Sequence, residues 1–250
     1  MIKIDRLACP TELTQEVKDA KTEKFKSDGS SVWNEEYIKT RLREMSHNKC
    51  CYCECDVTEG GSYMEIEHFH PKGQYPDEVV EWNNLLPSCK KCNSQKGEHD
   101  TVSSPIINPS TDMPQDHLKI RMGFRFKSKD DMGEETIEAL DLNNQNRHTN
   151  PRHKVLNKVE DKVASLLEQA KTYISIEPKT TLRKNKLLRG VRELLELCQP
   201  TEPYSAFKAT ALLTSDCYTD LKDILNSENL WSQEFIDLER NLLSIKYETC

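Results

Sequence analysis

Apolar residues recur every three or four positions over much of the second half of the chain, which is the pattern of helices that bury one face. The first such run follows Asn150, which can cap a helix with Pro151 at its first position, and it contains Val155, Val159 and Val163. Later runs with the same spacing, separated by proline, asparagine and serine turns, cover residues 179–198, 203–214, 215–226 and 231–244. Residues 149–250 are therefore predicted to be helical throughout.

The first hundred residues predict a smaller, mixed unit. Ile38, Leu42 and Met45 have helical spacing, and Asn34 can cap their helix, which should end within residues 46–49. Downstream, the pattern predicts a short strand, a loop, a second extended piece and a short helix at residues 63–69, 71–76, 81–86 and 89–96. His68 would then lie near the end of the first strand.

A connector that contains several proline and serine residues joins the two parts. It predicts a hairpin over residues 118–127, with a turn at Met122-Gly123. Four units are expected: an N-terminal segment with its helix, a core, the connector and a helical C-terminal region, at residues 1–45, 46–100, 101–148 and 149–250. The predicted fold class is α+β and predominantly helical.

The composition is that of a chain that needs no disulfides to fold. A chain of 250 residues can bury roughly 75% of its unfolded surface. Six of the ten cysteines fall in two tight clusters, which favours metal ligation in a reducing compartment over a secreted disulfide framework. No segment resembles a signal peptide or approaches the apolar length of a membrane span. We therefore expect a soluble, cytoplasmic protein with no membrane partner.

The formal net charge of -7 argues against a protein that holds a polyanion by overall attraction. Nucleic acid would have to meet a local basic patch. Residues 179–192 contain six Lys and Arg residues and no acidic residue, and Lys186, Arg189 and Arg192 share one helical face. A solvated helix face is the simpler interpretation of this patch. A partner protein that supplies the positive surface is equally compatible with the charge.

Two Cys-x-x-Cys pairs have the ligand spacing of a tetrahedral structural Zn²⁺ site, at Cys50, Cys53, Cys89 and Cys92. Cys51 and Cys55 complicate the register, because they could make a pair with three intervening residues. The two-residue gap of the first pair, however, matches that of the second. The long gap between the pairs must hold a folded insertion, and candidate acid and base residues fall within it.

That insertion contains the segment Glu-Ile-Glu-His-Phe-His-Pro-Lys at residues 65–72. A neutral imidazole such as His68 can take a proton from water near neutral pH, and a carboxylate such as Glu67 can hold a divalent cation against a phosphate oxygen. Because adjacent residues on a strand point to opposite faces, one can reach the metal while the other reaches the water. Such ligands suit Mg²⁺ or Mn²⁺, so two metals with different roles are predicted.

In order, spacing and residue type this region resembles the HNH endonuclease motif with its ββα-metal core. The matching motifs are Cys50-x-x-Cys53, the segment at residues 65–72, Asn84-Leu85 and Cys89-x-x-Cys92-Asn93-x-x-Lys96-Gly97. The match covers about residues 46 to 100. A weaker resemblance extends over the whole chain to the HNH nuclease subunit of Septu-type antiphage defence systems, which also accompanies some retrons. Its supporting phrases include Ile107-Asn108-Pro109 and Leu142-Asn143.

The resemblance implies a role for each matching residue. His68 would be the general base that activates water, Glu67 would ligate the catalytic cation, and Asn93 would be the second protein ligand. Asn84 would be the middle residue of the catalytic motif, usually as an amide that pins the loop carrying the base.

Two positions depart from the usual motif, since Glu67 stands where Asp is common and Asn93 where many members have His. Both substitutes keep an oxygen ligand. His70 and Lys96 could contact phosphate. The alternatives are that His70 assists the base or simply packs, and that Lys96 is a solvated lysine. His99 is a weaker candidate of the same kind.

The leading prediction is a metal-dependent endonuclease that hydrolyses nucleic-acid phosphodiester bonds, with DNA as the expected substrate and RNA as the alternative. The resemblance further implies a partner ATPase of the ABC or SMC-like type, to which the helical C-terminal region would dock. A non-catalytic, zinc-organised adaptor or nucleic-acid-binding protein is the competing hypothesis. It needs only the four cysteines, and it predicts that replacing His68 with alanine leaves the biological activity unchanged.

Overall fold

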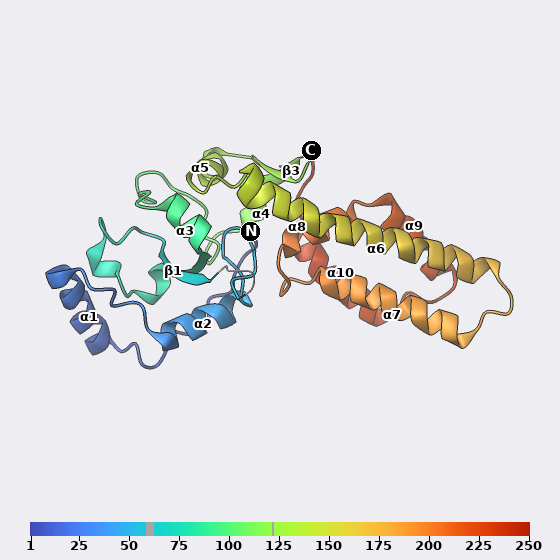
Figure 1. Cartoon of the computed structure of the whole chain (residues 1–250), viewed down its shortest axis with the longest axis horizontal. Coiled ribbons are helices and arrows are strands. Elements are labelled where there is room, and N and C mark those ends of the chain that lie inside the picture. Colours follow the sequence, from blue (N-terminus) through green and yellow to red (C-terminus); the bar gives the residue numbers. More distant parts are fainter. Residues whose placement is uncertain (59–62, 122) are drawn as a thin grey trace.

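The first hundred residues and the long C-terminal helices lie toward opposite ends of the molecule (Figure 1). The computed structural model describes residues 1–58, 63–121 and 123–250. In these residues helices predominate, and each of the two small sheets has two strands. The α+β, predominantly helical fold class is confirmed at this level.

Two helices, α1 (Gln15–Asp28) and α2 (Glu36–Ser46), precede the first strand. The helix predicted from apolar spacing is α2, which buries Ile38, Leu42 and Met45. The prediction that Asn34 caps it was wrong. Glu35 is the N-cap residue and makes no capping bond with its side chain, so burial of the apolar face rather than a cap accounts for this helix. The separate helix α1 was not predicted.

Two antiparallel strands and a short helix follow, namely β1 (Met64–His68), β2 (Leu85–Cys89) and α3 (Lys90–Lys96). The predicted order of strand, loop, strand and helix is confirmed, and His68 is the last residue of β1. The loop continues through the short 3-10 turn η1 (Pro76–Glu78). The extended piece expected from residue 81 was wrong in its first half, which forms a second 3-10 turn, η2 (Trp82–Asn84). The turn at η2 buries Trp82 and Asn84, whose side chains bond back to the N-terminal segment and to the loop after β1.

The connector has more structure than the predicted hairpin. It contains α4 (Pro114–His117), β3 (Leu118–Arg121), β4 (Arg125–Ser128), α5 (Asp131–Ala139) and the π-helical turn η3 (Gln145–Thr149). The hairpin itself is confirmed by the antiparallel pairing of β3 with β4. Its predicted turn includes Met122, which lies outside the described residues. The end of the chain runs beside β3, where Ile120 N donates to Glu248 O over 2.9 Å. The prediction that the C-terminal region is helical throughout was therefore wrong at its end.

The C-terminal region is built from α6 (Asn150–Ser175), α7 (Thr181–Leu197), α8 (Ser205–Leu213), α9 (Asp216–Ser227) and α10 (Gln233–Ile245). The central helix is α8, which is buried along almost its whole length and contacts α6, α9 and α10. Asn150 does not cap α6 as predicted, because η3 runs directly into that helix and Thr149 already has helical geometry. Among the described residues, we find no helix with the length and apolar character of a bilayer span.

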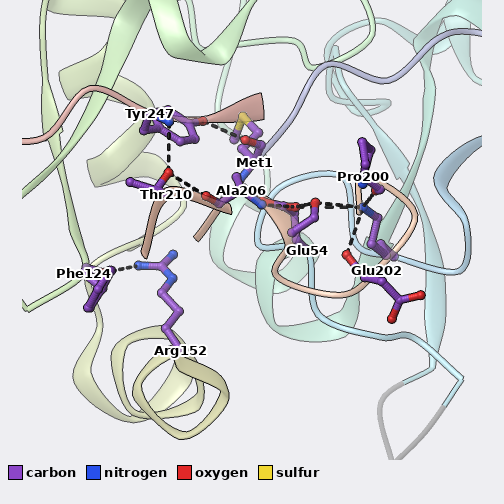
Figure 2. A network of polar contacts seen from close by, with 11 residues as sticks. Met1, Glu54, Phe124, Arg152, Pro200, Glu202, Ala206, Thr210 and Tyr247 are labelled. Atoms are coloured by element: carbon purple, nitrogen blue, oxygen red, sulfur yellow. Dashed lines mark hydrogen bonds and ion pairs between the residues drawn. The ribbon is translucent and has the colours of Figure 1, made fainter. Parts of the chain in front are cut away.

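A buried polar network joins the cysteine-rich turn to the helical region (Figure 2). The Glu54 carboxylate accepts from the Met1 amino group at 2.6 Å, from the Ser205 hydroxyl at 2.5 Å and from the Ala206 backbone N–H at 3.3 Å. Burial alone would raise the pKa of Glu54, but the Met1 amino group and Lys49 outweigh it and lower the pKa to about 2. The carboxylate is therefore ionised and holds the start of α8 against the turn.

Candidate active site

Four buried cysteine sulfurs converge where the turn after α2 meets the end of β2. The sulfur atoms of Cys50, Cys53, Cys89 and Cys92 all lie within 4.8 Å of one another, and those of Cys53 and Cys89 are 3.8 Å apart. Four thiolates placed tetrahedrally at a Zn–S distance of about 2.3 Å would be about 3.8 Å apart. All four are free cysteines, so the cluster could hold a metal such as zinc.

A tight turn shapes the first half of this cluster. Glu54 has a left-handed conformation with φ +61°, its N–H donates to Cys50 O over 3.0 Å, and Cys50 N donates to Cys55 O over 2.9 Å. Cys51 N donates to Pro87 O over 2.8 Å, which ties the turn to β2. Cys51 and Cys55 are outside the group of four sulfurs. Burial raises the pKa of the Cys51 thiol well above its ordinary value.

The packed thiols lower the pKa of two of the four cysteines, Cys50 and Cys89. The hydrogen bond with Cys50 raises the pKa of Cys89, but contacts with Cys53, Cys55 and Cys92 outweigh it and lower the pKa to about 5. The thiolate is the form of cysteine that binds zinc. The chemistry of this donor set therefore fits a structural zinc ion.

A cavity of about 390 Å³ opens beside β1 and α3. Three of the predicted site residues, Glu67, His68 and Asn93, line it together. Its wall also includes Glu65 and Lys72, which lie in the segment at residues 65–72 but were given no individual role. The cavity thus combines carboxylate, amide, imidazole and ammonium groups. Together these groups can bind a phosphate and transfer a proton.

His68 is almost fully buried at the end of β1, and its hydrogen bond defines its tautomer. Its Nε2 lies 2.9 Å from Val79 O. Because a carbonyl oxygen can only accept, Nε2 carries the proton and Nδ1 keeps its lone pair. Burial lowers the pKa of His68 to about 4, so the ring is neutral at pH 7. The ring also meets Trp33 edge to face, with centroids 4.7 Å apart, so its plane is fixed and a base is available at Nδ1.

Glu67 is buried against Lys96 of α3. Lys96 Nζ lies 2.7 Å from Glu67 Oε1 and donates to His68 O over 2.9 Å. Burial raises the pKa of Glu67 to about 7, although the charge of Lys96 acts in the opposite direction. Within the described residues the Lys96 ammonium is therefore the charge partner of Oε1. A divalent cation at this oxygen would compete with that ammonium.

Asn93, in the second turn of α3, is held by a residue of β1. Its Nδ2 donates to Glu65 Oε2 over 2.7 Å. Since a carboxylate can only accept, the amide nitrogen must face Glu65, and Oδ1 faces away from it. An amide oxygen is a suitable ligand for Mg²⁺ or Mn²⁺. Sequence reasoning missed Glu65 as a partner of Asn93, although it lies in the motif segment.

Asn84 lies behind the cavity rather than in its wall. Its Oδ1 accepts from His70 N over 2.7 Å, and its Nδ2 donates to His70 O and Glu78 O over 3.1 and 3.2 Å. The amide therefore pins the loop that follows His68. His70 Nδ1 lies 2.7 Å from Glu78 Oε2, and Lys96 is committed to the buried pair described above. The catalytic role of Asn84 and the phosphate contacts of His70 and Lys96 stay predictions.

Two further residues at the cavity had no assigned role. Lys72 Nζ lies 5.5 Å from the centre of the Trp33 ring and 3.8 Å from Glu98 Oε1, and its side chain is partly exposed. A lysine in this position can contact phosphate. Trp33 could not be identified from the sequence. Its role in the site is to pack against the His68 ring, and the two residues are far apart in the sequence.

Comparison with known proteins identifies the family. The chain is 42% identical over 248 residues to Septu protein PtuB of Bacillus thuringiensis, in an alignment that covers 97% of this chain and 95% of the relative. It is 26% identical over 298 residues to Septu protein PtuB of Bacillus mycoides (strain KBAB4), covering 98% of this chain and 100% of the relative. No family model matches the chain. The chain belongs to the Septu PtuB family, which confirms the Septu part of the resemblance.

Proposed function

We propose that this protein is a metal-dependent endonuclease of the HNH type and the effector nuclease of a Septu antiphage defence system. The observation that carries the proposal is a neutral His68, with its Nδ1 unprotonated, in the wall of the cavity that Glu67 and Asn93 also line. The order of β1, β2 and α3 supports an HNH core, since it puts the base at the end of a strand and the amide in the following helix.

Two metal ions would serve this enzyme in different ways. Zinc held by the four cysteines would be structural, because protein ligands fill all four tetrahedral positions. Mg²⁺ or Mn²⁺ would be held by the oxygens of Glu67 and Asn93, which are hard ligands of the right kind. When bound, it would stabilise charge on the phosphorane and on the leaving 3′-oxygen.

The protein's own groups would carry the proton and hold the substrate. His68 Nδ1 accepts a proton from water as the water attacks phosphorus, while the bond from Nε2 to Val79 keeps the ring in place. The bond to the 3′-oxygen breaks and a 5′-phosphate remains. Asn84 acts as a positioning residue through the loop after β1. Lys72, at the cavity wall, offers a charge-assisted contact for a phosphate oxygen.

A partner is part of the proposal. An ABC or SMC-like ATPase would license the nuclease in the cytoplasm, with the helical C-terminal region as its docking surface. The net charge of -7 supports dependence on a partner for holding the substrate, because so acidic a chain attracts a polyanion poorly at long range. DNA is proposed as the substrate, with RNA as the alternative.

The test compares cleavage of plasmid DNA and total RNA by wild type and His68→Ala, in Mg²⁺ and in Mn²⁺, with and without the ATPase encoded beside it. We expect nicking or degradation by wild type and a loss of about 10²- to 10⁴-fold in His68→Ala. His117→Ala, which removes a half-buried imidazole outside the cavity, should cleave like wild type. If wild type and His68→Ala are equally inert on both polymers with the partner present, the zinc-organised adaptor becomes the better account.

A further inference from the structure

The outward face of the β3–β4 hairpin is made of cations. Leu118, Ile120 and Phe126 are buried against the core. Because alternate residues of a strand point to opposite sides, the residues between them face away from the core. These are Lys119 and Arg121 on β3 and Arg125 and Lys127 on β4. We call this four-residue surface the basic ribbon.

The strand register sets these cations against one another. Lys119 is directly opposite Lys127, and Arg121 is directly opposite Arg125. Directly opposed side chains of an antiparallel pair have Cβ atoms only about 5 Å apart, and like charges there are destabilising. Two such pairs in a two-stranded sheet work against folding. They are better explained by an anion that the ribbon binds.

The protein gives the basic ribbon little charge compensation of its own, because Lys119 acts on Glu248 more weakly than Lys129 does. Across residues 1–58, 63–121 and 123–250, no ion pair involves any of its four cations. The neighbouring carboxylate of Glu248 is paired with Lys129 over 2.9 Å instead. Glu134 and Glu138 of α5 line the same groove as the ribbon but make no ion pair with it. The ribbon therefore remains available to an external anion.

A groove of about 900 Å³ runs along the basic ribbon. Arg121, Arg125 and Lys127 line it on one side. Side chains from η3 and α6, including Gln145, Asn150 and His153, line it too, and they can donate hydrogen bonds to phosphate oxygens. The groove combines charge with hydrogen-bond donors, as a binding site for a phosphate backbone requires.

The groove lies next to the elements of the proposed active site. Gln145 begins η3, and Arg147 in the same turn donates to Gln95 Oε1 of α3 over 2.7 Å. α3 is the helix that carries Asn93. Figure 1 shows α3, α5 and β3 along the same upper side of the molecule. A single polyanion could therefore contact the ribbon and approach the cavity.

We infer that the basic ribbon is a second nucleic-acid-binding surface, which holds the phosphate backbone of duplex DNA beside the cavity. The inference rests on the proposed function in taking nucleic acid as the substrate. A two-stranded β-ribbon fits the major groove of B-DNA, which is about 12 Å wide, whereas the A-form major groove of duplex RNA is too narrow for it. A local cluster of cations also explains how a chain with a net charge of -7 can hold a polyanion.

The test measures binding without cleavage. Fluorescence anisotropy of a labelled duplex DNA is followed from 50 to 200 mM salt, with no divalent cation added, for wild type and for Arg121→Ala/Arg125→Ala/Lys127→Ala. Each lost phosphate contact reduces the slope of log affinity against log salt by about 0.9, so the triple variant should have a slope shallower by about 2.7 and weaker binding throughout. Its thermal midpoint should not fall, because the change relieves like-charge repulsion.

The matched control removes the same charge from α7, in Arg183→Ala/Lys186→Ala/Arg189→Ala. This control should keep the wild-type affinity and slope. Equal slopes for wild type and the ribbon variant, a larger loss in the α7 control, or no binding by wild type at 50 mM salt would each overturn the inference. A wild-type chain that binds duplex DNA through the ribbon but cleaves neither polymer would refute the proposed nuclease and leave the ribbon intact.

Discussion

Asn93 donates its side-chain amide to Glu65 across the gap between α3 and β1, with 2.7 Å between Nδ2 and Oε2. This bond decides which end of the amide faces the rest of the site. A carboxylate cannot donate, so the amide oxygen is directed away from Glu65 and is left for a cation. Glu65 thus acts through Asn93, as residues behind a metal ligand commonly do.

Replacing Glu65 should therefore weaken cation binding rather than remove the base. In Glu65→Ala the amide of Asn93 can rotate, and we expect the Mg²⁺ or Mn²⁺ concentration for half-maximal cleavage to rise about 10- to 100-fold. Glu65→Gln keeps an accepting oxygen and should lose less. Calorimetric titration of Mn²⁺ gives a readout independent of cleavage. Unchanged cation affinity in Glu65→Ala would show that the bond has no part in positioning Asn93.

The cysteine cluster predicts one tightly bound zinc per chain, measured by elemental analysis of the purified protein. Cys92→Ser should lose the zinc and several kcal/mol of stability, which lowers the thermal midpoint by about 2–4 °C per kcal/mol. Cys198→Ser, at a buried cysteine of the helical region, and Cys55→Ser should keep the metal. Zinc retained in Cys53→Ser but lost in Cys55→Ser would mean that the register with Cys51 and Cys55 is the true one.

How well an element could be predicted depended on how it is buried. α2 buries one face, and its apolar spacing was sufficient to place it. β1 is buried at four of its five positions, and its alternating pattern ending on a charged pair was sufficient to place it. α1 buries no residue completely, so no apolar spacing marks it. Its local signals are its caps, since the Thr14 hydroxyl accepts from Val17 N and Gly29 adopts the left-handed conformation at the end. Such signals are weak without a buried face.

The cysteine cluster could be predicted more fully than the candidate active site, because its ligand spacing is local. A Cys-x-x-Cys turn is local, so the four sulfurs that lie together could be named from spacing. The bond from Asn93 to Glu65 and the ion pair of Lys96 with Glu67 join a strand to a helix far along the chain, and no spacing rule predicts them. The opposed charges of the basic ribbon likewise appear only when the register of β3 and β4 is known.

Acid should weaken the fold partly through His148, which is buried in η3. Burial, with a smaller effect from the charge of Arg152, lowers the pKa of His148 to about 4. The unfolded chain, with a pKa of about 6.5, therefore takes up the proton first, and stability falls as the pH drops from about 6.5 toward 4. The loss between pH 7 and 5 is about 2 kcal/mol.

His148→Gln should flatten this part of the curve. Denaturant unfolding at several pH values between 7 and 5 measures the slope directly, whatever the absolute stability of the variant. Parallel curves for wild type and His148→Gln would assign the acid sensitivity to other groups.

The buried pair of Lys96 and Glu67 gives a way to ask whether Glu67 binds a cation. In the wild type a divalent cation must compete with the Lys96 ammonium, which lies 2.7 Å from Glu67 Oε1. Lys96→Met leaves the carboxylate buried and unpaired, at a cost of about 3–5 kcal/mol. A cation that binds Glu67 then replaces the missing charge. Mn²⁺ should therefore raise the thermal midpoint of Lys96→Met more than that of wild type.

The double variant Glu67→Gln/Lys96→Met supplies the control for this argument, because it has neither the carboxylate nor the ammonium. It should be more stable than Lys96→Met without Mn²⁺, since no unpaired charge remains buried, and it should lose the Mn²⁺-dependent shift. If the single and double variants respond to Mn²⁺ alike, Glu67 is a structural partner of Lys96 and the catalytic cation must be held elsewhere. Because thermal shifts are measured without substrate, this result stands whether or not cleavage is observed.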